Sequence, residues 1–164
     1  KNINNKIIQF KQKMFYYKLN LFYPEFNWFG SKACKKKHLI SPQWLRNIKS
    51  KKYSKLRLDL IFNKKKYSDI FYVQEGGWHF TCIRTAEELE YKLKNFAHHY
   101  EYEESGLKVE DLKKLISEKR VMYDHNVDQT GYKWSGKSKL VKVSNAELPE
   151  HICLNKNKYE KWLD

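Results

Sequence analysis

The chain has 164 residues, a mass of 20.0 kDa and a net charge of +14, from 33 lysines and arginines against 19 aspartates and glutamates. This length suits one compact domain, and the 41% of hydrophobic residues supply a core, which excludes a wholly disordered chain. No stretch approaches the roughly 18 consecutive apolar residues of a membrane helix, and the start lacks the pattern of a secretion signal. We therefore expect a single domain over residues 1–164 that contains no membrane segment.

The first segment repeats apolar residues at alternating spacings of four and three, with lysine and glutamine between them. This periodicity predicts an amphipathic helix of about five turns over residues 3–21, which Pro24 would end. The aromatic run at 22–30 predicts a packed loop or a short strand. The repeated positions are Ile3, Ile7, Phe10, Met14, Tyr17 and Leu21.

The middle of the chain predicts a short helix and three strands. Ser41 followed by Pro42 is typical of a helix start, and the helix should run to Ile48. Residues 49–55, with the lysines Lys49, Lys51 and Lys52, have no apolar period and predict an exposed loop. Residues 56–62, 70–73 and 78–83 are strand-like, and the polar residues 63–66 suit a turn.

The second half predicts two well-marked helices. Thr85 and Glu88 have capping-box spacing, and apolar residues line one face of the segment behind them. A second helix is indicated from Val109 to about residue 119, with acidic residues at its start. The polar segment 124–136 predicts a loop, 140–143 a short strand and 155–163 a final helix.

The positive charge favours anionic partners, but it does not identify one. Only four of the basic residues are arginine, which is the side chain best suited to reading bases and phosphates. A solvated lysine surface is the simpler interpretation, so we expect no specific nucleic-acid partner. A non-catalytic basic module that binds nucleic acid or anionic surfaces stays the alternative. The three cysteines are widely spaced and form no Cys-x-x-Cys pair, so neither a disulfide framework nor a zinc ribbon is indicated.

Several residues have side chains suited to chemistry, yet each also has an ordinary structural interpretation. His79 follows a Gly-Gly-Trp sequence and can bind a metal or a phosphate, although a strand histidine is more often structural. His98 and His99 precede three glutamates, which indicates either a metal cluster or a solvated helix end. His125 lies in a polar, glycine-bearing loop that suits binding and ordinary turns equally. No P-loop, Rossmann, hydrolase-elbow or zincin motif is present.

In chain order, these residues resemble one family over nearly the whole sequence. The block 76–81, Gly-Gly-Trp-His-Phe-Thr, is the most specific part of the resemblance, and the segments 95–98 and 111–116 follow it. Upstream, residues 14–20, 28–30 and 45–46 also fit, as do Leu148-Pro149 with Asn155 and Tyr159 near the end. The chain thus resembles glycosyltransferase family 17, the β-1,4-mannosyl-glycoprotein 4-β-N-acetylglucosaminyltransferases.

The resemblance implies an α/β fold of GT-A type, with a mixed sheet flanked by helices and completed by strands upstream of this chain. It implies transfer of N-acetylglucosamine from UDP-GlcNAc to a glycan acceptor, as in N-linked glycosylation, with inversion and with Mn²⁺ or Mg²⁺ as cofactor. Substrate contacts would fall to Gly76, Gly77, Trp78, His79 and Arg84. His79 would complete a metal site, and Trp78, Tyr100 or Trp134 would line the acceptor subsite.

Two departures from the family qualify these expectations. The sequence contains no Asp-x-Asp, the motif that holds metal and diphosphate in this fold class. We therefore expect the chain to be the carboxy-terminal portion of an enzyme and inactive alone, because the donor-binding half would precede Lys1. Arg84 stands where relatives tend to have small residues. Glu75 is a weak candidate for the catalytic base, and the compartment is left open: cytoplasmic in a microbe or virus, Golgi membrane in a eukaryote.

Overall fold

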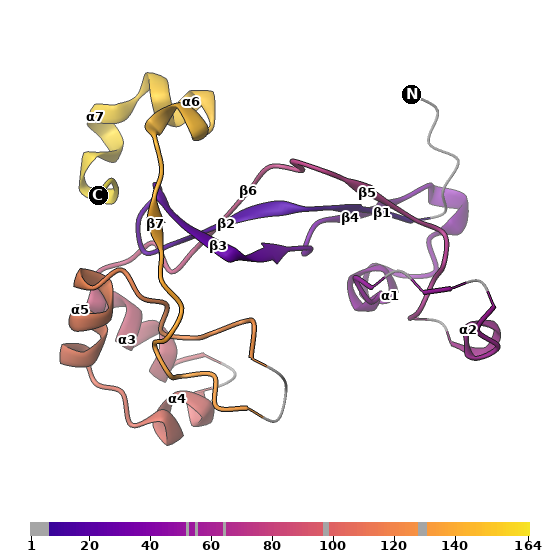
Figure 1. Cartoon of the computed structure of the whole chain (residues 1–164), viewed down its shortest axis with the longest axis horizontal. Helices are drawn as coiled ribbons and strands as arrows, with labels where there is room; N and C mark the ends of the chain where they lie inside the picture. Colours follow the sequence, from indigo (N-terminus) through magenta and orange to yellow (C-terminus); the bar gives the residue numbers. More distant parts are fainter. Residues whose placement is uncertain (1–6, 52, 55, 64, 97–98, 128–130) are drawn as a thin grey trace. The chain divides into compact units, whose positions relative to one another are not determined.

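The computed structural model describes residues 7–51, 53–54, 56–63, 65–96, 99–127 and 131–164, and its architecture is mixed α/β (Figure 1). The chain divides into two compact units, and the backbone passes between them three times. The first unit is Lys1–Gln12 with Asn27–Gly77, and the second is Lys13–Phe26 with Trp78–Asp164. The expectation of a single domain stays a prediction. None of the described helices is long and apolar enough to cross a membrane.

The first unit contains a three-stranded sheet of order β4-β1-β5. The central strand pairs antiparallel with β4 and parallel with β5. The elements of the first unit are β1 (Ile7–Phe10), β4 (Lys32–Cys34), η1 (Lys36–His38), α1 (Pro42–Asn47), α2 (Asp59–Phe62) and β5 (Ile70–Val73). A small core joins this sheet to α1 through Ile7, Trp44, Ile48 and Ile70.

The second unit contains a four-stranded sheet of order β6-β2-β3-β7, in which β2 and β6 are parallel and β3 and β7 antiparallel. Its strands are β2 (Gln12–Tyr16), β3 (Leu21–Trp28), β6 (Trp78–Thr81) and β7 (Val141–Lys142). Its helices are α3 (Ala86–Lys94), α4 (His99–Ser105), α5 (Val109–Ser117), η2 (Asn145–Glu147), α6 (Glu150–Leu154), α7 (Lys156–Tyr159) and η3 (Glu160–Trp162).

Both faces of this second sheet are covered. On β2, Met14 and Tyr16 belong to a core cluster that includes residues of α3, α4 and α5, whereas Phe15 between them belongs to a cluster with Leu148 and Ile152 near the carboxy terminus. Successive side chains of a strand point to opposite faces, so this alternation places the two clusters on opposite sides of the sheet.

The predicted amino-terminal helix is wrong, because its described part forms β1, β2 and the start of β3. The spacing of three and four accounts for only some of the buried residues. Met14, Phe15, Tyr16 and Tyr17 are buried in succession, and Gln9, on the supposed polar face, is fully buried. A continuous buried run of this kind is typical of a central strand covered on both faces, not of a helix with one apolar stripe.

The strand predicted for residues 56–62 is also wrong. The segment is a turn that leads into the single-turn helix α2, and Leu56, Leu58 and Phe62 are exposed. Asp59 binds both Arg57 and Lys66 through ion pairs, which hold the segment in a compact turn.

Elsewhere the local patterns are confirmed. The Ser41 hydroxyl accepts a hydrogen bond from the Trp44 amide at the start of α1, and Thr85 and Glu88 form a complete capping box on α3. Strands β5 to β7 and helices α5 and α7 also fall in predicted segments, and the described parts of 49–55 and 124–136 contain no helix or strand. Helices α4 and α6 were not predicted. Ile3, Lys52 and His98 lie outside the described residues. All three cysteines are free thiols.

Candidate functional site

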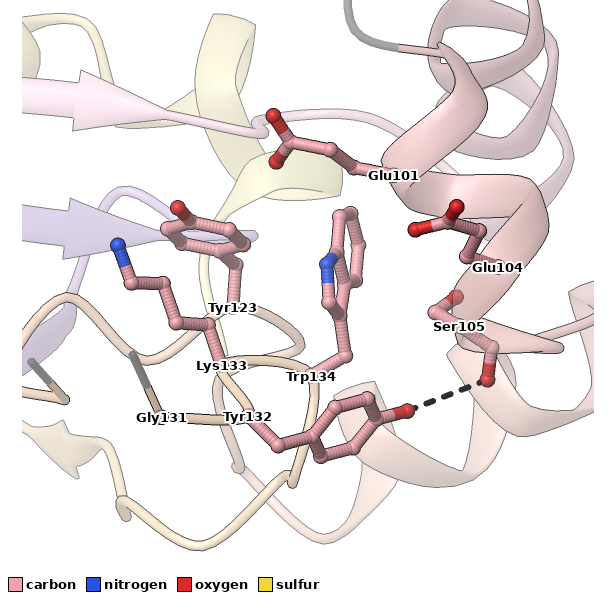
Figure 2. Close-up of a pocket in the computed structure, with 8 residues that line it drawn as sticks. All are labelled: Glu101, Glu104, Ser105, Tyr123, Gly131, Tyr132, Lys133 and Trp134. Atoms are coloured by element: carbon pink, nitrogen blue, oxygen red, sulfur yellow. Dashed lines mark hydrogen bonds between the residues drawn. The ribbon is translucent and has the colours of Figure 1, made fainter. Parts of the chain in front are cut away.

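Two adjoining cavities of about 370 and 360 Å³ lie in the second unit. The first is between α4 and the loop that follows α5, and the second is between that loop and residues of β2, β6 and α3. They share Glu101, Tyr123 and Trp134 as lining residues, and we call them together the groove. The first cavity is also lined by Glu104, Ser105, Gly131, Tyr132 and Lys133 (Figure 2). The second is lined by Tyr16, Thr81, Leu93, Phe96, Met122 and His125.

The aromatic rings of the groove are held by one another and by the neighbouring helix. The Trp134 ring lies edge-on to Tyr123, with centroids 5.2 Å apart, and packs against Tyr102 of α4 at 5.8 Å. The Tyr132 hydroxyl donates a hydrogen bond of 3.2 Å to the Ser105 carbonyl at the end of α4 (Figure 2). These contacts fix the rings before any ligand arrives.

A buried hydrogen-bond network anchors the loop that carries these rings. The carboxylate of Asp124 accepts hydrogen bonds from the Tyr23 hydroxyl at 2.7 Å, from Ser138 at 2.6 Å and from the Asn126 amide at 2.9 Å. The Asp124 amide donates to the Lys133 carbonyl at 2.7 Å, which joins two distant points of the loop. Burial alone would raise the pKa of Asp124, but these hydrogen bonds outweigh it and lower the pKa.

Two histidines lie close together beside the groove. His79 stands two residues before Thr81 on β6, so both side chains are on the groove face of the sheet, and His125 lies near enough for the two imidazoles to repel one another when charged. Burial lowers the pKa of His79. Burial is also the main reason that the pKa of His125 falls to about 4, with Lys133 and His79 adding to it. Both lowered pKa values favour the uncharged imidazole, which is the form that binds a metal ion.

The groove combines flat aromatic faces with carboxylates. Figure 2 shows Glu101 and Glu104 extending from α4 on the same side as the Trp134 indole. Aromatic rings pack against apolar faces of a ligand, while carboxylates accept hydrogen bonds from its hydroxyl groups. A ligand with apolar ring faces and many hydroxyls, such as a sugar, matches both features.

The residues predicted from the Gly-Gly-Trp-His block do not all meet at this groove. His79 lies beside it, but Trp78 points to the opposite face of the sheet by strand alternation and donates its indole hydrogen to the Glu147 carbonyl at 2.7 Å. Arg84 lines a separate cavity of about 310 Å³ with Lys18, Lys113 and Trp162.

The two glycines form part of a bulge. Phe10 pairs with Val73, and Lys13 pairs with Trp78. Between these pairs the four residues 74–77 lie opposite the two residues 11–12, which makes a bulge. Gly76 donates its amide hydrogen to the Lys11 carbonyl at 2.7 Å, and a Cβ on Gly76 would lie 2.7 Å from that of Phe10. Gly76 thus allows close approach of the neighbouring backbone, whereas Gly77 adopts a φ of 110°, which favours glycine. The exposed Glu75 has a φ of 52° in the same bulge.

The described residues do not form a complete metal site. In the ranges that the structure describes, no group of three or more His, Cys, Asp or Glu side chains could hold a metal ion. His99 instead places its Nδ1 3.2 Å from the Phe96 carbonyl. Among the described residues His79 stays a candidate ligand, but a complete set of ligands would need residues beyond those described.

The sequence indicates Trp134, His125 and, among the three glutamates after His99, Glu101 as separate candidates, but it gives no such indication for Tyr123 and Tyr132. The nearest sequence clue was the presence of three large aromatic residues, 123, 132 and 134, in and beside a polar loop. None of the known family models, curated proteins or solved structures compared with the chain matches it.

Proposed function

We propose that the chain is the carboxy-terminal portion of a glycosyltransferase resembling family 17, of GT-A type, and that the groove of its second unit binds the glycan acceptor. The observation that carries the proposal is the position of His79. The most specific part of the resemblance, residues 76–81, brings this imidazole to the sheet face that also lines an aromatic, carboxylate-bearing groove.

The proposed reaction is transfer of N-acetylglucosamine from UDP-GlcNAc to an acceptor hydroxyl, with inversion. Tyr132 and Trp134 would stack on the acceptor sugars, and Glu101 is better placed than Glu75 to accept the proton of the attacking hydroxyl, because it lines both cavities. Mn²⁺ or Mg²⁺ would neutralise charge on the departing diphosphate when bound by an upstream Asp-x-Asp and His79.

Acceptor binding can be tested on the present chain. A mannose-terminated N-glycan core oligosaccharide, titrated while intrinsic tryptophan fluorescence is recorded, should bind with a saturable change. Replacing the exposed Tyr132 by alanine should weaken binding about five- to tenfold, the value of one aromatic contact. The matched control is Tyr91→Ala, a tyrosine of α3 that is 73% exposed, against 61% for Tyr132, and that lines neither cavity. Absence of binding, or equal weakening by both variants, would contradict the acceptor site.

The transfer step needs the chain joined to its proposed donor-binding half. With UDP-GlcNAc, Mn²⁺ and the acceptor, His79→Ala should raise the Mn²⁺ requirement about 10- to 100-fold, as loss of a metal-binding contact does. Glu101→Gln should lower kcat and leave acceptor binding nearly unchanged. A His79→Ala variant with the wild-type metal requirement would remove this residue from the proposal.

A further inference from the structure

The positive charge of the chain is concentrated in the first unit. Residues 1–12 and 27–77 contain 16 lysines and arginines against three acidic residues, a net charge of +13. The second unit, with 17 basic and 16 acidic residues, has a net charge of +1. The lysines themselves are divided almost equally, 14 in the first unit and 15 in the second, so the separation comes from the acidic residues, of which the first unit has three and the second 16. The first unit therefore has a field that attracts anions, and the unit with the groove does not.

The same unit exposes large aliphatic and aromatic side chains within one short segment. Leu56 is 91% exposed, Leu58 78% and Phe62 89%. Leu58 and Phe62 are four residues apart across α2, so they share one side of this turn. Leu39 and Ile40, which follow the lysine run 35–37 after one histidine, are exposed as well.

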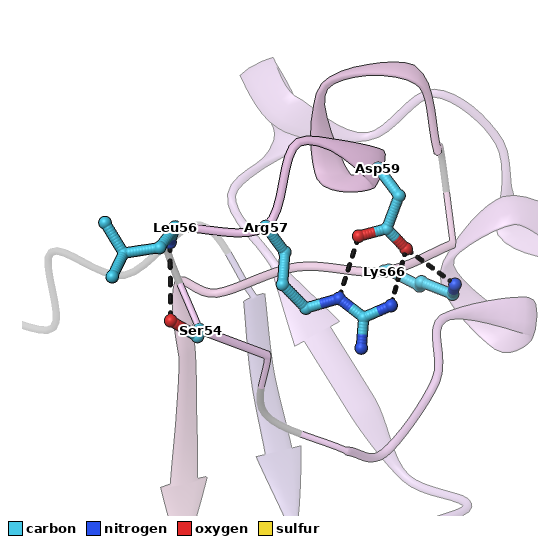
Figure 3. Close-up of polar contacts among 5 residues, drawn as sticks. All are labelled: Ser54, Leu56, Arg57, Asp59 and Lys66. Atoms are coloured by element: carbon cyan, nitrogen blue, oxygen red, sulfur yellow. Dashed lines mark hydrogen bonds and ion pairs between the residues drawn. The ribbon is translucent and has the colours of Figure 1, made fainter.

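These apolar side chains are held outward by a set of charged contacts. Asp59 accepts two hydrogen bonds from the Arg57 guanidinium, at 2.8 and 3.0 Å, and one from Lys66 at 2.9 Å (Figure 3). Both cations also lie 5.6 Å from the Tyr53 ring. In Figure 3 the Leu56 side chain extends away from this cluster. The Arg57 and Asp59 side chains are accessible to solvent as well, so this turn presents charged and apolar groups together on its surface.

We propose that the first unit binds the surface of an anionic lipid bilayer. Its lysines would lie at the phosphate level, and Leu56, Leu58 and Phe62 would enter the boundary between headgroups and acyl chains. Basic residues next to exposed aliphatic side chains are the combination that anionic membranes bind, since attraction and apolar burial add. Nucleic acid would also be attracted by the positive charge, but it has no apolar layer in which Leu56 and Leu58 could be buried. The unit also has only two arginines, of which Arg57 is paired with Asp59.

The test is sedimentation of the 164-residue chain with vesicles of phosphatidylcholine alone or mixed with phosphatidylserine. The chain should bind the mixed vesicles, bind phosphatidylcholine much more weakly and dissociate as salt is raised. The triple variant Leu56→Asn, Leu58→Asn, Phe62→Asn should bind the mixed vesicles at least about tenfold more weakly. Its matched control is Leu154→Asn, a leucine 76% exposed in the second unit, which should bind like the wild type.

A second pair of variants tests the charge. The change Lys36→Gln with Lys37→Gln should weaken binding about 30-fold, whereas Lys156→Gln with Lys158→Gln, exposed lysines of the second unit, should not weaken it. Circular dichroism reports folding, and Leu56→Asn alone serves if the triple variant does not fold.

The proposal is overturned if mixed vesicles fail to bind at low salt, or if the apolar variants bind as tightly as the wild type. It is also overturned if a single-stranded oligonucleotide binds more tightly than the mixed vesicles and displaces the chain from them, which would make nucleic acid the partner.

Discussion

The Tyr23 hydroxyl should stabilise the second unit through the buried carboxylate of Asp124. Tyr23 is fully buried, donates to Asp124 at 2.7 Å and accepts from the Asn126 side chain at 3.1 Å. Tyr23→Phe removes a hydrogen bond to a charged group, and we expect a loss of about 1.5 to 3 kcal/mol in the free energy of unfolding. Tyr102 is the matched control, because it is also buried but its hydroxyl has no hydrogen-bond partner among the described residues. Tyr102→Phe should therefore be neutral or stabilise by up to about 1 kcal/mol.

Urea unfolding of the two variants and the wild type, followed by circular dichroism, measures both values. Equal losses for Tyr23→Phe and Tyr102→Phe would refute the reasoning, since the cost would then reflect ring packing and not the hydrogen bond. The pH dependence gives a further check. The pKa of Asp124 is lowered in the folded state, so its stabilising effect is present above its ordinary pKa of 3.8 and is lost as the pH falls through the folded value. The difference in the free energy of unfolding between the wild type and Tyr23→Phe should therefore become smaller as the pH falls below 3.8.

Three further predictions concern other parts of the chain. The pKa of His125 is about 4 in the folded state and 6.5 in the unfolded state, so the free energy of unfolding should fall by about 2 to 3 kcal/mol as the pH is lowered from 6.5 to 4. Urea unfolding at several pH values should show this loss in the wild type and not in His125→Gln. The same pH profile for both proteins would contradict the prediction. Gly76→Ala places a Cβ 2.7 Å from that of Phe10 and should cost about 2 kcal/mol or more in thermal melts, whereas Gly106→Ala, with open space but a φ of 69°, should cost about 1 kcal/mol. The reverse order would show that the bulge adapts. Thr85→Ala should lower the free energy of unfolding by about 1 kcal/mol, whereas Thr85→Ser, which keeps the hydroxyl, should leave it nearly unchanged in urea unfolding. Equal losses in the two variants would show that the cap does not stabilise α3.

The local elements that the sequence predicted are those determined by neighbouring residues. The caps at Ser41 and Thr85 act within three residues of the helix start, so spacing alone identifies α1 and α3. Helix α4 was missed because the sequence 99–105 has no apolar stripe, and Tyr102 is its one buried residue. Its position depends on packing against the Trp134 ring, which lies more than 30 residues away in the chain.

The sequence by itself determined the composition, the charge, the cap positions and the glycines at 76 and 77, because these depend on residue identity and short spacing. Tertiary structure decided that residues 7–10 and 12–16 are strands, because their burial comes from partners distant in the chain. It likewise decided which candidate residues meet. Strand alternation separates Trp78 from His79, whereas the Asp124 network brings His125 and Trp134 to the side of the sheet where His79 lies. Side chains converge on a site through long-range pairing, and spacing along the chain carries no record of that pairing.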